Sequence, residues 1–415
     1  MEEFDIKQKA LCVEFDPQDR FYTCRWNLRQ EVKAELNLPQ HVTILDTTLR
    51  EGEDTPWVFY TLEQKLQIAR ALEEIGVPEI DCGFASLSKE HLETVKAVKA
   101  AGLSIKTMAI TRVDVANPEA AIDMTIDAGA DIILIAIYGV PIPGFGADDF
   151  VNLIEKSVSY TKKRGAFCSF WVPVTRWEQA FAERLYKAAV RGGADRVEIA
   201  GAGCVGPTAF KLMTKWLKGI AGDRQVGVHC HDSLGIGTAC ALSGVEAGAE
   251  VVHTSVNGMS DGGGLAAFEE VVLALSSIYG FDLGIKLERL KELSNMVQEI
   301  TKVKIHPYKS IVGDSVFVEG PDSHLEKIMK GEAKWSDTFF VNPEAIGQKL
   351  QLVFGPSALG GRGIRAKAGQ MGLSLSEGEW QKVLEAMKES LKIKGGLTED
   401  EIEILIKEPG GAYSK

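Results

Sequence analysis

Several features that define other classes of protein are missing from this sequence. It contains no run of 18 or more apolar residues, so it lacks the pattern of a transmembrane helix. Its acidic first residues are unlike the basic and apolar regions of a signal peptide, and we expect no secretory leader. Only seven cysteines are scattered over 415 residues, a length that can bury a core without disulfides. We therefore expect a cytoplasmic protein with free thiols and no membrane partner.

Positive charge is also scarce. The chain has 46 Lys and Arg against 58 Asp and Glu, which gives a net charge of −12. This balance argues against binding to nucleic acid or to an anionic membrane surface. The contents of 45% hydrophobic and 25% charged residues are ordinary for a globular enzyme. Anionic small substrates stay possible, because a local arginine or a metal ion outweighs a distant net charge.

A regular alternation of short apolar runs and helical patterns fills most of the chain. The segment from Leu62 to Ile75, for example, has helical spacing and ends at Gly76. Eight strand–helix units in series predict an α/β fold of the (β/α)8 TIM-barrel type. An open doubly wound sheet is the alternative, although no glycine fingerprint for a dinucleotide follows the first strand. The eight apolar runs cover residues 42–46, 79–82, 104–110, 131–137, 167–172, 196–200, 225–231 and 250–257.

The limits of this alternation define the expected domains. Residues 1–40 are weakly patterned and are interpreted as an N-terminal extension. Residues 41–285 form the predicted barrel. Residues 286–415 read as smaller, mostly helical C-terminal subdomains, which serve as a lid or a dimerisation region in this interpretation.

Two short motifs carry the chemistry. Arg50 and Glu51 lie in the stretch DTTLREGE at the end of the first predicted strand, and His229 and His231 end the seventh strand. Two histidines at i and i+2 of a strand point to the same side. The C-terminal ends of all barrel strands meet at one mouth. The histidines and one carboxylate from a distant strand end therefore predict a site for a divalent metal ion.

Taken together, these motifs and the TSVNG stretch at 254–258 resemble a known enzyme family. It is the family of acyl-CoA-dependent condensing enzymes: homocitrate synthase, 2-isopropylmalate synthase and citramalate synthase. They belong to the barrel superfamily of HMG-CoA lyase. The resemblance implies that Glu51, His229 and His231 hold a divalent metal ion (Zn, Mn, Co, Fe or Mg). It also implies that Arg50 is catalytic and binds the carboxylate of a 2-oxo acid.

The implied reaction is a Claisen-type condensation of an acyl-CoA, with acetyl-CoA expected, and a 2-oxo acid. The metal polarises the ketone, a base removes a proton from the acyl methyl group, and hydrolysis of the thioester releases CoA. His324 occupies a position similar to a family histidine in the C-terminal region and is the candidate base. A homodimer is also expected from the resemblance. A lyase or aldolase using the same metal site is the alternative function.

Further candidate site residues lie at strand ends and at positions where this sequence departs from the pattern of the family. Arg112 and Arg176 are available to bind a substrate anion, and each can equally be a surface charge. Cys204 stands near a usual threonine and is a candidate substrate contact or a buried thiol. His253 is interpreted as structural. A biotin-dependent carboxyltransferase and a non-enzymatic role are weaker alternatives. Loss of activity is a further alternative, because the positions that depart from the family pattern cluster at the site. They are Asp54, Val172, Cys204, Leu265, Glu319 and Phe339.

Overall fold

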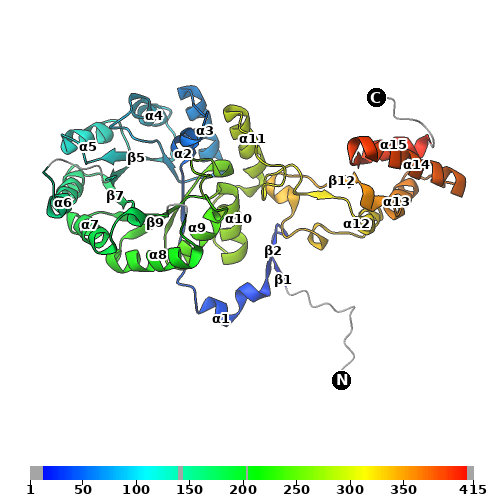
Figure 1. The fold of residues 1–415 in the computed structure, drawn as a ribbon, viewed down its shortest axis with the longest axis horizontal. Coiled ribbons are helices and arrows are strands. Elements are labelled where there is room, and N and C mark those ends of the chain that lie inside the picture. The colour runs from blue at the N-terminus through cyan, green and yellow to red at the C-terminus, as the bar shows by residue number, and fades with distance from the viewer. Residues whose placement is uncertain (1–12, 139–143, 202–203, 409–415) are drawn as a thin grey trace, which may run out of the picture. The chain divides into compact units, whose positions relative to one another are not determined.

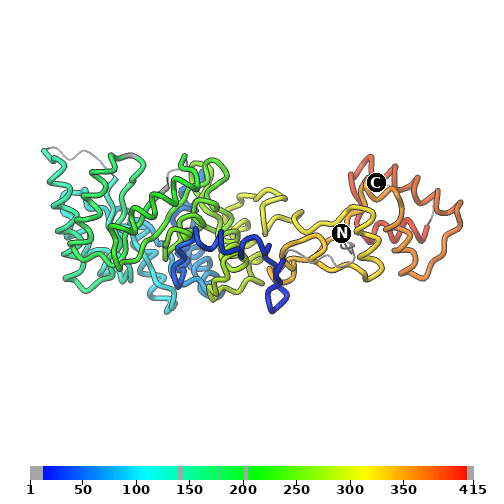
Figure 2. Tube along the Cα trace, turned by 90° about the horizontal axis from the view of Figure 1, so that it is seen from below, coloured from blue at the N-terminus to red at the C-terminus, as the bar shows by residue number. Residues whose placement is uncertain are grey.

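The computed structural model describes residues 13–138, 144–201 and 204–408. These residues divide into two compact units. The first contains residues 13–14 and 23–305, and the second contains residues 15–22 and 306–408. The path of the chain through each unit can be followed by colour in Figure 2.

Eight parallel strands close into a barrel in the first unit (Figure 1), so the TIM-barrel prediction is confirmed. The strands follow one another around the barrel in chain order, and β10 closes the circle on β3 with Val252 opposite Ile44. Seven of the eight predicted runs end within two residues of an observed strand end. The strands are β3 (Thr43–Asp46), β4 (Glu79–Asp81), β5 (Lys106–Arg112), β6 (Ile132–Ala136), β7 (Phe167–Val172), β8 (Arg196–Gly201), β9 (Gln225–Cys230) and β10 (Val251–Thr254).

Helices surround these strands, as Figure 1 shows. In α3 (Leu62–Ile75), Thr61 and Gln64 form a capping box at the start, and Gly76 ends the helix at a φ of 105°. Ile68, Ala69, Leu72 and Ile75 are buried, which explains the helical spacing in the sequence. The other helices of the first unit are α1 (Gln30–Lys33), α2 (Thr48–Asp54), α4 (Lys89–Ala100), α5 (Pro118–Asp127), α6 (Ala147–Lys163), α7 (Gln179–Gly192), α8 (Pro207–Ala221), α9 (Gly237–Glu246), α10 (Phe268–Tyr279) and α11 (Leu290–Thr301).

The two ends of the barrel interior differ in chemistry. At the N-terminal end, Arg196 begins β8 and Glu79 begins β4, and the guanidinium donates two hydrogen bonds of 2.8 and 2.9 Å to the carboxylate. Arg196 is 1% exposed. The barrel also contains a cluster of buried apolar side chains that includes Leu45, Met108 and Leu134. Arg196 Nη1 also lies 3.8 Å from Glu198 Oε1, so the lower ion pair is connected to a carboxylate that lines the cavity at the opposite end.

The second unit has its own hydrophobic core. Leu325, Phe354, Trp380 and Met387 belong to it. Its sheet has the order β11-β12-β13, with β11 (Val318–Glu319) parallel and β13 (Leu397–Thr398) antiparallel to β12 (Gln351–Phe354). Its helices are α12 (Asp322–Met329), α13 (Arg362–Gln370), α14 (Glu377–Lys394) and α15 (Glu399–Lys407).

Two short strands complete the description, β1 (Val13–Phe15) and β2 (Tyr22–Cys24), which pair with each other. Phe21 also bridges Val341 in an antiparallel manner, which ties residues 15–22 to the second unit. Among the described residues, none of the helices is both long enough and apolar enough to cross a bilayer.

Candidate active site

The first site residues are positioned by the turn from β3 into α2. Asp46 ends the strand, and its Oδ1 accepts a 2.8 Å hydrogen bond from the backbone N–H of Thr48. The Thr47 N–H donates to the carbonyl of Thr254 at 2.7 Å, which fixes the turn to β10. The first turn of α2 then carries Arg50 and Glu51 over the C-terminal end of the barrel.

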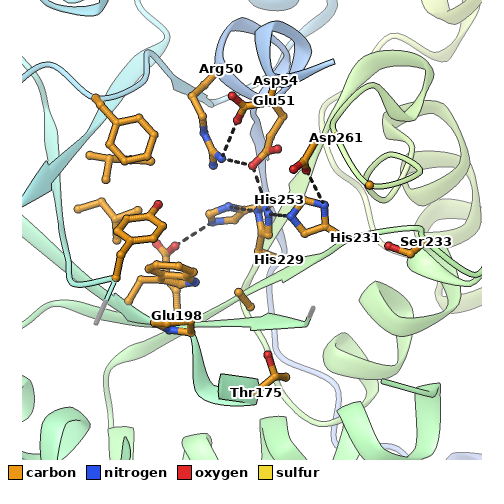
Figure 3. A pocket seen from close by; sticks show the side chains of 18 residues that line it. Arg50, Glu51, Asp54, Thr175, Glu198, His229, His231, Ser233, His253 and Asp261 are labelled. Atoms are coloured by element: carbon orange, nitrogen blue, oxygen red, sulfur yellow. Dashed lines mark hydrogen bonds and ion pairs between the residues drawn. The ribbon is translucent and has the colours of Figure 1, made fainter. Parts of the chain in front are cut away.

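Glu51 meets two histidines that lie about 180 positions later in the sequence (Figure 3). Candidate ligand atoms of Glu51, His229 and His231 all lie within 4.8 Å of one another. His229 Nε2 is 3.3 Å from Glu51 Oε1 and 3.3 Å from His231 Nε2. The structure thus brings together the three residues predicted to bind a metal.

The chemistry of this cluster fits a divalent cation. Burial lowers the pKa of His229 well below its usual value, and the neighbouring imidazoles of His231 and His253 act in the same direction. A neutral imidazole keeps a free lone pair, which a metal requires. Ser260 Oγ donates a 2.5 Å hydrogen bond to Glu51 Oε2 and so orients the carboxylate. Two imidazoles and one carboxylate beside an open cavity form a typical donor set for such an ion.

Arg50 lies beside the cluster and is held by carboxylates. Its Nε donates to Asp81 Oδ2 at 2.9 Å, and its Nη1 contacts Glu51. Burial disfavours the charged form of Arg50, but the charges of Glu51 and Asp81 outweigh this effect and raise its pKa. Arg50 is therefore a permanent cation at the mouth of the barrel.

Behind His229 lies a buried chain of polar groups that the sequence analysis did not identify. His229 Nδ1 is 3.3 Å from His253 Nδ1, and His253 Nε2 is 3.1 Å from Glu198 Oε2. Glu198 also accepts a 2.6 Å hydrogen bond from Ser169 Oγ. His253 was interpreted as structural, but it contacts a predicted metal ligand. The available signal was its position near the end of the last barrel strand.

These residues line a cavity of about 420 Å³. Its acidic rim includes Asp54, whose pKa is raised to about 6 by burial, with Glu51 and Asp261 adding to the effect. Asp261 also lies 3.6 Å from His231 Nδ1. On the other side, the lining consists largely of apolar and aromatic side chains, namely Phe84, Ile110, Leu134, Tyr138, Trp171 and Pro173.

The other predicted site residues lie elsewhere. Arg112 pairs with both oxygens of Asp114, at 2.9 and 2.7 Å, and it does not line the cavity. Cys204 is exposed and does not line the cavity either. His324 belongs to the second unit, where its Nδ1 lies 2.7 Å from Glu319 Oε2. The side chain of Arg176 lies outside the described part of the structure.

Comparison with known families decides the classification. The family model described as HMGL-like matches residues 41–297, which include the whole barrel and the metal-type cluster. The chain belongs to the HMGL-like family. The match confirms the resemblance that the two motifs predicted.

Named relatives of this HMGL-like protein are synthases. A homocitrate synthase of Methanopyrus kandleri is 32% identical over 383 residues, which cover 91% of this chain and 95% of the relative. A probable 2-isopropylmalate synthase of Ignicoccus hospitalis is 33% identical and covers 89% of this chain and 92% of the relative. The protein is an enzyme of the acyltransferase type, as the sequence analysis expected.

Solved structures show the same fold. The hydroxymethylglutaryl-CoA lyase of Pseudomonas aeruginosa superposes with a TM-score of 0.56 at 14% identity, covering 68% of this chain and 99% of the lyase. At this level of identity the likeness concerns the fold alone. The relatives with higher sequence identity are synthases, so a lyase reaction is not favoured.

Proposed function

We propose that the protein condenses an acyl-CoA, with acetyl-CoA as the expected donor, and a 2-oxo acid. The reaction consumes water, releases CoA and forms a hydroxy acid with one carboxylate more than the 2-oxo acid. The observation that carries this proposal is the cluster of Glu51, His229 and His231 beside Arg50 at the barrel mouth. Its occurrence in a chain about 32% identical to named synthases supports the condensing reaction.

Each residue of the cluster has a specific role in this proposal. Glu51, His229 and His231 would hold a divalent metal ion, which polarises an oxo group when it is bound. Arg50 binds the carboxylate of the 2-oxo acid, because it is a buried cation that faces the cavity. Ser260 keeps Glu51 in its ligating orientation.

Proton transfer needs a base near the methyl group of the acyl-CoA. His324 remains the predicted base, and its pairing with Glu319 orients the imidazole within the second unit. Removal of the methyl proton produces an enolate that attacks the oxo carbon, and water then cleaves the thioester. The homodimer, the cytoplasmic location, and the substrate contacts of Arg112 and Cys204 also remain predictions.

The proposal is tested with the purified full chain. Metal content is quantified, and release of free thiol from acetyl-CoA is followed with a panel of 2-oxo acids. His229→Ala is compared with His306→Ala, a control on an exposed histidine of the second unit. We expect bound metal and thiol release in the wild type and in the control, and loss of both in His229→Ala. A wild-type protein that releases no thiol with any acid would refute the proposal.

A further inference from the structure

We propose that the cavity selects a 2-oxo acid with a bulky apolar or aromatic substituent and rejects one with a second carboxylate. This inference rests on the proposed function and names the substrate class of the same site. It is carried by the division of the cavity wall into a charged half and an aromatic half.

The two halves come from different parts of the barrel. The charged half uses α2, which follows β3, together with β9 and β10; it contains Arg50, Glu51 and His229. The aromatic half uses β5, β6, β7 and the segments that follow β4 and β6. In the closed strand order, β9, β10 and β3 are contiguous, and β5 to β7 lie across from them. A substrate whose carboxylate is bound at Arg50 therefore directs its substituent toward the aromatic half.

Three rings define this aromatic half. The ring centroids of Phe84 and Tyr138 are 6.0 Å apart, and those of Tyr138 and Trp171 are 5.0 Å apart, with interplanar angles of 51° and 50°. Behind the rings lie Ile110 and Leu134, which are 2% and 4% exposed. Tilted rings over an apolar base offer faces and edges to an aliphatic or aromatic group. They offer no positive charge to a carboxylate.

Charge in the rest of the cavity also disfavours a dicarboxylic substrate. Among the described residues that line the cavity, Arg50 is the one permanent cation. Arg112 ends β5 but does not line the cavity; it pairs with Asp114, and its guanidinium lies 5.2 Å from the centroid of the Tyr138 ring. The other charged lining residues include Asp54 and Asp261, which repel anions. A second substrate carboxylate would thus be desolvated without a cationic partner, which is costly.

Thiol release and binding are measured with the metal-loaded protein. Phenylpyruvate and 4-methyl-2-oxopentanoate are compared with 2-oxoglutarate and oxaloacetate, and calorimetric titration of each acid gives its affinity. We expect kcat/KM to be about 100-fold or more higher for the two apolar acids, the size of effect that pocket complementarity produces. Higher kcat/KM and affinity for 2-oxoglutarate would overturn the inference and leave the condensation intact. Absence of thiol release with every acid would overturn the condensation itself.

A pair of variants links the preference to the rings. Trp171→Ala removes a ring from the cavity wall, whereas Trp177→Ala removes a ring that stacks on Phe181 and does not line the cavity. We expect Trp171→Ala to lower the phenylpyruvate to 2-oxoglutarate ratio of kcat/KM by about 10-fold or more, with Trp177→Ala leaving it unchanged. If Trp171→Ala does not fold, Trp171→Phe is used instead, and we expect it to lower the same ratio by a smaller factor. An unchanged ratio in folded Trp171→Ala and Trp171→Phe would refute the role of the rings.

Discussion

The substitution Glu198→Gln tests the buried chain behind the proposed metal ligands. His229 directs Nε2 toward Glu51 and His231, so its proton belongs on Nδ1, which faces His253. His253 Nδ1 must then accept, and its own proton belongs on Nε2, beside Glu198. This assignment of protons follows from the network of contacts. A carboxylate at position 198 thereby determines the tautomer of both imidazoles.

The magnitude follows from the burial of this contact. Glu198 is 0% exposed, and the contact between His253 Nε2 and Glu198 Oε2 is 3.1 Å. A glutamine of the same shape loses the charge that stabilises the protonated Nε2 and can present an N–H in place of an oxygen. Loss of such a supporting carboxylate typically weakens metal binding about 10- to 100-fold, which is about 1.4–2.8 kcal/mol. We expect a loss near the lower limit, because the amide oxygen can still accept.

Competition with a chromophoric chelator measures the affinities for Zn²⁺ and Mn²⁺. Glu246→Gln is the control, since it removes a carboxylate that pairs with Lys211 and accepts from Tyr279 but contacts neither Glu198 nor His253. We expect metal affinity in the control to stay within about 2-fold of the wild type, in line with the local reach of such supporting contacts. Equal affinities in wild type and Glu198→Gln would refute the tautomer argument. An equal loss of metal affinity in Glu246→Gln would show that the effect comes from a general loosening of the barrel.

Three further predictions concern other buried charges. Arg196→Met leaves Glu79 buried without its partner and should lower the free energy of unfolding by about 3–5 kcal/mol in urea titrations. Adding Glu79→Leu should recover part of the loss, since Glu198 also lies 3.8 Å from Arg196; no recovery would contradict the pairing of Arg196 with Glu79. Burial raises the pKa of Asp46 from 3.8 to about 7, so the folded state binds this proton more tightly than the unfolded state, and stability should fall as the pH rises from about 4 to 7. Asp46→Asn should remove this decline and stabilise the protein at pH 8 by up to roughly 4 kcal/mol relative to wild type; parallel pH profiles in urea unfolding would count against it. Arg50→Lys should lower kcat/KM for the 2-oxo acid about 10- to 100-fold with little change in the KM for acetyl-CoA, and an unchanged value would remove Arg50 from the carboxylate site.

Local pattern was enough to predict the barrel and one part of the site. Apolar runs mark strands because a strand inside a barrel is buried along its length, and β9 was predicted at 225–231 and observed at Gln225–Cys230. Arg50 and His229 could then be placed at one mouth, since parallel strands all end on the same face. The positions of the motif residues could therefore be predicted from the strand ends and the fold class alone.

The contacts between strands were decided by the tertiary structure alone. His253 and Glu198 are 55 positions apart in the numbering and meet because β8, β9 and β10 are adjacent in the closed barrel. Arg196 and Glu79 pair across 117 positions because β8 and β4 lie on opposite sides of the closed barrel and the two side chains meet in its interior. Periodicity reports whether a residue faces the interior of its own element, but it carries no information about which side chain lies opposite.

Arg112 shows that sequence pattern also fails to predict which side chains pair when the partners are close in the sequence. In the sequence it is an arginine at the end of a barrel strand, similar in position to Arg50. In the structure, Arg112 pairs with Asp114 and lies over the ring of Tyr138. Arg50 instead pairs with Asp81 and Glu51 and lies beside the cavity. The sequence determined that cations and ligands would gather at the barrel mouth. Folding decided which cation faces the cavity, because only packing in three dimensions sets which carboxylate each guanidinium meets.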